Sequence, residues 1–279
     1  MLLTNDLTEI TANLLFHMHP CATKKKFGQH FLFDAKINRK IVSLAGNLRD
    51  KVVVEVGPGP GGLTLEILKQ AVKKIVLVEV DSHWRNVWND LGVQFDKKVE
   101  IIGKDALLCD YKGISPHVII SNLPYNISTH LLCKLLTELN TFESLILTFQ
   151  KEVADRLCAR PATKAYGKLS VMAQHLAKIE KVFEIVPGSF LPAPKVKSTV
   201  LKITPHLNSR VWSDSFSTLL TYAFAHRRKI VAKTLTKFIK DPEQILRDLG
   251  YNANTRAEEI SVEDYAKLHL CLDNRVFES

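Results

Sequence analysis

From Lys51 onward, short β-branched apolar runs alternate with segments whose apolar residues recur at helical spacing. The runs with the length and composition of buried strands are 52–56, 75–80, 99–102, 118–121 and 145–149. Between them, segments such as 63–70 and 129–139 have the spacing of amphipathic crossover helices. This alternation predicts an α/β fold with a parallel sheet.

The pattern changes further along the chain. Two more strand-like runs, around 182–186 and at 199–203, are joined by a segment rich in proline and glycine, which predicts a rigid exposed loop. After Pro205 the strand signal stops, and the segments with helical spacing are 216–224, 230–239, 242–249 and 262–270. We therefore predict an N-terminal extension at 1–23, an α/β domain at 24–205 and a small all-helical domain at 206–279.

Composition narrows the class of protein. The chain has 279 residues, of which 46% are hydrophobic, enough for one large domain and a smaller one. No stretch approaches the roughly 18 consecutive apolar residues that span a bilayer, and the start lacks the layout of a secretory signal. We therefore expect a cytoplasmic protein with no membrane partner. The five cysteines lie far apart without metal-ligand spacing, so no metal site is predicted.

Charge adds a candidate partner. The formal net charge is +9, and the basic residues gather in two clusters. Their members are Lys24, Lys25, Lys26, Lys36, Arg39 and Lys40 near the start, and Arg227, Arg228, Lys229, Lys233, Lys237 and Lys240 near the end. Either cluster alone fits an ordinary solvated face. Together they indicate nucleic acid about as well as they indicate solvated faces.

A glycine-rich turn follows the first strand of the predicted sheet. Gly57, Gly59 and Gly62 fit the spacing G-x-G-x-x-G, in which glycines let the backbone approach a ligand closely. Glu79, near the end of the second predicted strand, lies about where an acid would hold a ribose. This pattern alone suits a nicotinamide dinucleotide or S-adenosylmethionine.

Three features favour S-adenosylmethionine. Glu55 puts a carboxylate two residues before the first glycine, where it would repel a pyrophosphate but could meet a cationic ligand or a backbone amide. Pro60 removes an N–H group that a pyrophosphate would use. Asp105, after the third strand, can accept a hydrogen bond from an adenine amino group. The alternative is that Glu55 and Asp105 are only capping or loop acids.

The fourth strand ends in a possible grip for a planar base, at the edge where open parallel sheets bind ligands. Asn122 can accept from an exocyclic amine, and the main-chain carbonyl of Leu123, which Pro124 biases toward an extended geometry, can accept the amine's other hydrogen. Tyr125 can stack on the ring. The alternative is a simple turn, in which Asn122 caps a helix and Tyr125 packs in the core.

This grip suggests a mechanism for methylating the N6 amine of adenine. That nitrogen is a poor nucleophile because its lone pair is delocalised into the ring. Two acceptors on its hydrogens favour a pyramidal nitrogen whose lone pair can point at a sulfonium methyl group. The hypothesis needs no strong base, since positioning carries most of the rate.

These motifs together resemble the rRNA adenine N6-dimethyltransferase family from about Lys24 to the end of the chain. The motifs that carry the resemblance are 25–32 (KKFGQHFL), 55–59 (EVGPG), 78–81 (VEVD), 122–125 (NLPY) and 190–198 (FLPAPKVKS). The segments 165–171 and 255–261 are similar to the bacterial small-subunit (16S) branch in particular. The resemblance implies a Rossmann-like S-adenosylmethionine-dependent methyltransferase sheet with a helical C-terminal domain.

The resemblance also implies roles for single residues. His30, Leu32 and Gly59 would meet the cofactor, and Gly57 would lie under its methionine part. Glu79 would hold the ribose hydroxyls, Asp105 would meet the adenine, and Asn122 would contact both sites. Phe190 would form the second face of an aromatic sandwich around the target base; the alternative is an ordinary core phenylalanine. Position 30 is commonly Asn in the family and is His here.

The implied substrate is a pair of adjacent adenosines in a hairpin loop near the 3′ end of 16S rRNA, within a pre-30S particle. Unstacked loop bases suit such a pocket. Lys24, Lys25, Lys26, Arg227, Arg228 and Lys229 would contact RNA, and we expect a monomer. The rival interpretations are a nicotinamide dehydrogenase, a large-subunit (23S) rRNA methyltransferase and a catalytically silent assembly factor.

Overall fold

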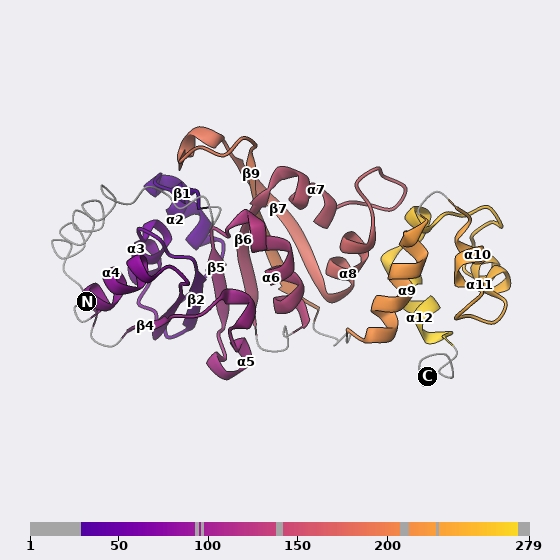
Figure 1. Ribbon diagram of the computed structural model, residues 1–279, viewed down its shortest axis with the longest axis horizontal. Helices are drawn as coiled ribbons and strands as arrows, with labels where there is room; N and C mark the ends of the chain where they lie inside the picture. Colours follow the sequence, from indigo (N-terminus) through magenta and orange to yellow (C-terminus); the bar gives the residue numbers. More distant parts are fainter. Residues whose placement is uncertain are drawn as a thin grey trace. The chain divides into compact units, whose positions relative to one another are not determined.

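The computed structural model describes residues 29–92, 95, 98–137, 142–206, 212–226 and 229–272 (Figure 1). The predicted extension at 1–23 lies outside these residues. The chain divides into two compact units. The first comprises the residues up to Ala154 together with 180–205, and the second comprises 155–179 together with the residues from His206 onward.

The first unit contains a mixed seven-stranded sheet. Its strands along the chain are β2 (Val52–Val56), β3 (Lys74–Val78), β4 (Val99–Ile102), β5 (Val118–Ser121), β6 (Ser144–Gln150), β7 (Ala177–Ile185) and β9 (Ser198–Pro205). In space the order is β4-β3-β2-β5-β6-β9-β7. The first five strands in this order, from β4 to β6, pair in parallel, and β9 runs antiparallel to β6. The predicted α/β class and its parallel strands are therefore confirmed, within a mixed sheet.

The strand order places a ligand crevice. From β2 the chain moves outward to β3 and β4, and then returns to place β5 on the other side of β2. Crevices form where the chain leaves neighbouring parallel strands in opposite directions, beyond their carboxyl ends. Ser121 Oγ donates to Val56 O at 2.6 Å and ties the ends of β2 and β5 together. The segments that follow these two strands begin at Gly57 and Asn122, so both lie at this crevice.

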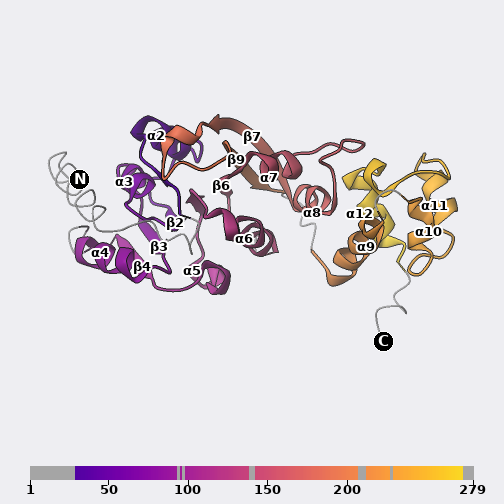
Figure 2. The ribbon, with the colours of Figure 1, turned by 45° about the horizontal axis from the view of Figure 1, so that its top comes forward.

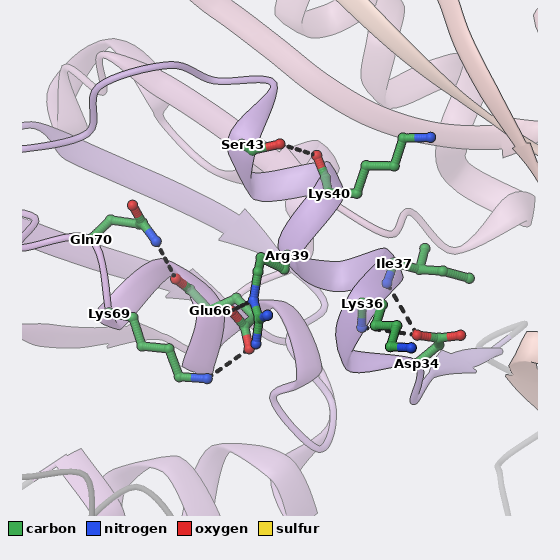
Figure 3. Close-up of polar contacts among 9 residues, drawn as sticks. All are labelled: Asp34, Lys36, Ile37, Arg39, Lys40, Ser43, Glu66, Lys69 and Gln70. Carbon is green, nitrogen blue, oxygen red and sulfur yellow. Dashed lines mark hydrogen bonds and ion pairs between the residues drawn. The ribbon is translucent and has the colours of Figure 1, made fainter.

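Helices connect the strands. In chain order they are α2 (Ala35–Ser43), α3 (Gly62–Leu68), α4 (Ser82–Gly92), α5 (Tyr111–Ile114), α6 (Tyr125–Thr137) and α7 (Lys151–Leu157), with the 3₁₀ turn η3 (Ala106–Leu108) before α5. Figure 3 shows Arg39 of α2 and Lys69, the C-cap residue of α3, converging on the buried carboxylate of Glu66. The ion-pair distances are 3.5 and 2.7 Å. The Arg39 pair links α2 to α3, so Arg39, one of the basic residues predicted to face a partner, is paired with an acid of the fold while its side chain stays 68% exposed.

A short ribbon lies beside the sheet, next to α2 (Figure 2). It pairs β1 (Phe31–Leu32) with β8 (Phe190–Leu191) in antiparallel register, Phe31 opposite Leu191 and Leu32 opposite Phe190. The loop predicted between β7 and β9 therefore contains structure of its own, the 3₁₀ turn η5 (Pro187–Ser189) followed by β8. The ribbon joins residues at the start of the described chain to the proline-rich segment.

The second unit is helical apart from the start of β7. Its helices are α8 (Lys168–Leu176), α9 (Asp214–Ala225), α10 (Val231–Leu235), α11 (Pro242–Asp248) and α12 (Val262–Leu270), with the 3₁₀ turn η6 (Ala257–Glu259). The sequence placed 155–179 in the first domain, whereas the structure groups this segment with the C-terminal helices. The physical reason is packing: Tyr166 is fully buried in the second unit, and its hydroxyl donates to Ile260 O at 2.9 Å.

Within the described ranges, no helix is both long enough and apolar enough to cross a bilayer.

Candidate active site

The main cavity opens at the crevice between the ends of β2 and β5. It contains about 830 Å³ of empty space, part of which is open to solvent. Its lining residues include His30, Gly57, Glu79, Asp105, Asn122, Leu123 and Pro124. A smaller cavity is lined by Leu32, Asn38, Glu55, Gly57, Pro60 and Asn122, among others. Asn122 and Gly57 line both cavities, so they join the predicted cofactor residues to the predicted base grip.

The glycine turn requires its glycines for two different reasons. Gly57 has φ +66°, a backbone conformation that favours glycine, and its N–H donates to Val78 O at 2.9 Å. Gly59 has φ +49°, and a Cβ there would lie 2.4 Å from the ring of Phe31. The indole N–H of Trp88 donates to Gly59 O at 2.8 Å. The turn is therefore held tightly from β1 and α4, with space for a ligand over Gly57.

Two carboxyl groups lie buried under this turn. The pKa of Glu55 is raised to about 8, mainly by burial and in smaller part by the nearby charge of Glu79. The hydrogen bond that Glu55 accepts from the Thr64 hydroxyl, at 2.6 Å, partly offsets this rise. Burial likewise raises the pKa of Glu79 to about 7, although its Oε1 accepts from the Asp81 N–H at 2.8 Å. Thr64 is a donor to Glu55 that the sequence interpretation did not name. A dehydrated pair of acids favours a ligand that supplies hydroxyl donors or positive charge.

Asp105 is placed both to cap a turn and to meet a ligand. Its Oδ1 caps η3 by accepting from Leu107 N at 2.8 Å, and the residue lines the main cavity. A carboxylate has two oxygens, so the cap leaves Oδ2 with capacity to accept from a ligand. Lys104 lines the cavity beside it and was not predicted.

Asn122 is held by two hydrogen bonds from different parts of the first unit. Its Nδ2 donates to His30 O at 2.7 Å, and its Oδ1 accepts from Thr148 Oγ1 at 2.7 Å. Neither bond is the helix cap of the alternative interpretation. Leu123 is buried and, with Pro124, lines the main cavity. The first two members of the predicted grip therefore lie together at the cavity.

The stacking roles of Tyr125 and Phe190 stay predictions, and the structure shows what surrounds the two rings. Tyr125 is half-buried; its hydroxyl is 2.5 Å from Ser198 Oγ, and its ring centroid is 5.3 Å from that of His30, at 31°. The ring Nδ1 of His30 lies 2.7 Å from Pro192 O, which can only accept. Phe190 is 4% exposed, belongs to the hydrophobic core and is not among the residues that line the two cavities. This geometry matches the core alternative for Phe190, so its stacking role stays a prediction. The aromatic neighbour of Tyr125 here is His30.

All six predicted RNA contacts stay predictions. Lys24, Lys25, Lys26, Arg227 and Arg228 lie outside the described residues. Lys229 is exposed in the second unit. In the part of the chain that the structure describes, no cluster of three or more potential metal ligands occurs, and the absence of a metal stays an expectation.

Comparison with known proteins now decides the family. Residues 21–274 match the family described as "Ribosomal RNA adenine dimethylase". The chain belongs to this family. It is 38% identical to the "Ribosomal RNA small subunit methyltransferase A" of Rhodospirillum rubrum, over 91% of this chain and 90% of that protein. It is 41% identical to the protein of the same name from Anaplasma phagocytophilum, over 91% and 96% of the two chains.

Solved structures agree with the fold of this adenine dimethylase family. A dimethyladenosine transferase from Plasmodium falciparum is 25% identical, with a TM-score of 0.75 over 86% of this chain and 96% of that chain. The 23S rRNA methyltransferase ErmE has a TM-score of 0.66 at 21% identity, over 88% and 100% of the two chains, and shows likeness of fold alone. The resemblance and fold class predicted from the motifs are therefore confirmed, and a nicotinamide dehydrogenase is no longer a rival.

Proposed function

We propose that this chain uses S-adenosylmethionine to dimethylate the N6 of two adjacent adenosines in a hairpin loop near the 3′ end of 16S rRNA, within the small ribosomal subunit. The observation that carries the proposal is the Asn122 amide, held at a cavity that also contains the glycine turn and Glu79. Family membership supports the reaction class. The names of relatives at 36–41% identity support the small-subunit branch.

The residues at the cavity fit S-adenosylmethionine. Gly57, with its positive φ, would lie under the methionine part, Glu79 would accept from the ribose hydroxyls, and Asp105 would accept from the adenine amino group. Burial raises the pKa of Glu55 to about 8 and that of Glu79 to about 7, so a ligand that brings positive charge would favour their ionised forms, whereas a pyrophosphate would raise both pKa values further. When bound, the cofactor supplies an electrophilic methyl group on a sulfonium.

The chain's own residues would position the nucleophile. The Asn122 Oδ1 and the main-chain carbonyl of Leu123 would accept the two amine hydrogens, which favours a pyramidal nitrogen with its lone pair directed at the methyl group. Tyr125 would support the base ring. No side chain has to act as a strong base, because the methylated amine is acidic enough to give its proton to water. Substrate positioning therefore carries most of the rate.

The RNA would be held mainly through its phosphates. Lys24, Lys25, Lys26, Arg227, Arg228 and Lys229 are the proposed contacts, and cytoplasmic pre-30S particles are the proposed partner. We propose that the enzyme acts as a monomer. Since phosphate contacts release counterions, affinity should fall steeply with salt.

The experiment that tests the proposal compares two substrates. Purified protein is incubated with methyl-labelled S-adenosylmethionine and either under-methylated small subunits or naked large-subunit rRNA. We expect label only in small-subunit rRNA, as dimethyladenosine at two adjacent positions by mass mapping. Label only in large-subunit rRNA would assign the chain to the other branch, and binding of small subunits without methylation would favour the silent assembly factor.

A further inference from the structure

A buried hydroxyl lies behind the proposed grip. Thr148 is in β6, between the buried residues Leu147 and Phe149, and it is 0% exposed. It is not among the residues that line the two cavities, yet its Oγ1 is 2.7 Å from Asn122 Oδ1. A polar group buried on a core strand costs free energy unless it is hydrogen-bonded, and here the hydrogen bond is made to Asn122.

The neighbouring bond settles which end of the amide faces Thr148. Asn122 Nδ2 is 2.7 Å from the carbonyl oxygen of His30, and a carbonyl oxygen can only accept. The NH₂ end must therefore face His30, the oxygen end must face Thr148, and the threonine hydroxyl must donate. We call this arrangement of His30 O, the Asn122 amide and Thr148 Oγ1 the amide clamp.

The amide clamp has a consequence for the reaction. An amide oxygen has two acceptor positions; Thr148 uses one, and the other is available to an amine in the cavity. If the amide turned over, its N–H groups would face the N–H groups of the amine, donor against donor. We propose that Thr148 is a positioning residue for methyl transfer: it keeps Asn122 Oδ1 oriented to accept from the target adenine amine. This inference rests on the proposed function.

The chain provides a matched control for this inference. Thr199 is a second buried threonine, on the adjacent strand β9, opposite Phe149. Among the described residues its Oγ1 has no hydrogen-bond partner. Thr148→Val and Thr199→Val are therefore the same isosteric change in neighbouring strands, and only the first removes a hydrogen bond to Asn122.

The test measures turnover and binding separately on under-methylated small subunits. For Thr148→Val we expect kcat to fall about tenfold, the effect of losing one ordinary hydrogen bond. The KM for subunits, the Kd for S-adenosylmethionine by calorimetry and the melting temperature should stay near wild type. Thr148→Ser keeps the donor and should restore kcat, and Thr199→Val should leave kcat unchanged.

A second readout does not depend on activity. The side-chain NH₂ resonances of Asn122, assigned by their absence in Asn122→Ala, should shift in Thr148→Val and stay in place in Thr199→Val. Wild-type kcat and an unshifted amide in Thr148→Val would overturn the inference, as would an equal loss of kcat in Thr199→Val. If the wild-type protein methylates no RNA, the proposed function fails, and the amide resonances alone then decide whether the clamp exists.

Discussion

The two halves of the site are built in different ways. The cofactor half is largely local: Gly57, Gly59 and the buried Glu55 all lie within a few residues of the end of β2. The acceptor half is assembled over long distances in the chain, since the hydrogen bonds from Asn122 reach His30 and Thr148, and His30 in turn reaches Pro192. Local backbone geometry therefore makes most of the glycine turn, which Phe31 and Trp88 hold in place, whereas tertiary packing makes the acceptor half. The two halves should respond separately to substitution.

The largest expected effect separates the halves at Asn122. Asn122→Ala removes the amide oxygen that would accept from the amine, while the glycine turn and Glu79 remain. We expect kcat for rRNA methylation to fall by about 10²–10³, comparable to removing one preorganised catalytic hydrogen-bonding group. The Kd for S-adenosylmethionine, measured by calorimetry, should change little. A variant with full turnover would refute the assignment of Asn122.

Gly59→Ala should have the opposite signature. The new Cβ would lie 2.4 Å from the Phe31 ring at a φ of +49°, so β1 and the turn must move apart. We expect the affinity for S-adenosylmethionine to fall about tenfold and the protein to lose about 2 kcal/mol of stability, from strain and a displaced aromatic ring. Gly46→Ala is the control, because Gly46 also has positive φ (+71°) but open space around its Cβ position. If both substitutions reduced stability and cofactor affinity equally, the loss would come from backbone strain at positive φ and not from the contact with Phe31.

The buried carboxyl of Glu55 predicts a pH dependence in the cofactor half. Its pKa is raised by burial from 4.5 to about 8, so the folded state holds this proton more tightly than the unfolded state does. The resulting stability is fully present below about pH 4.5 and is lost as pH rises through about 8. Urea unfolding of cofactor-free protein at pH 5 and pH 8 should show a decline that Glu55→Gln reduces by about 1–2 kcal/mol, allowing for relaxation around the site. If the free energy of unfolding fell by the same amount from pH 5 to pH 8 in the wild type and in Glu55→Gln, this prediction would be wrong.

The smallest expected effect concerns the second unit. Lys229 is exposed, and if it contacts a phosphate, Lys229→Ala should reduce the slope of log affinity against log salt by about 1. Binding of small subunits would be measured between low and physiological salt. The cofactor affinity should be unchanged. An unchanged salt slope would remove Lys229 from the RNA-binding surface.

Much of the sheet could be predicted from the chain alone. The strands at 99–102 and 118–121 match β4 and β5 residue for residue, since short buried strands in parallel sheets form continuous apolar runs. The helices α2, α4 and α8 were not assigned. The segment 155–179 lacks such a simple pattern, and its unit was decided by Tyr166, whose hydrogen-bond partner Ile260 lies 94 residues away.

The site shows the same division. Glu79 and Asp105 could be placed because each lies within three residues of the carboxyl end of a strand that the apolar pattern predicts. Phe190 and His30 could not, because the β1–β8 ribbon that buries Phe190 and brings His30 close to Tyr125 pairs segments about 160 residues apart. For Thr148 the sequence contained one usable signal: it is the polar residue in the otherwise apolar run 145–149.

By itself, the sequence determined the family, the parallel strands, the glycine turn and the identity of the residues at the strand ends, because these depend on local backbone preferences and on apolar periodicity. Only the tertiary structure decided which way the Asn122 amide points and which aromatic ring lies beside Tyr125. Those depend on hydrogen bonds and packing between segments whose separation along the chain carries no information about their distance in space.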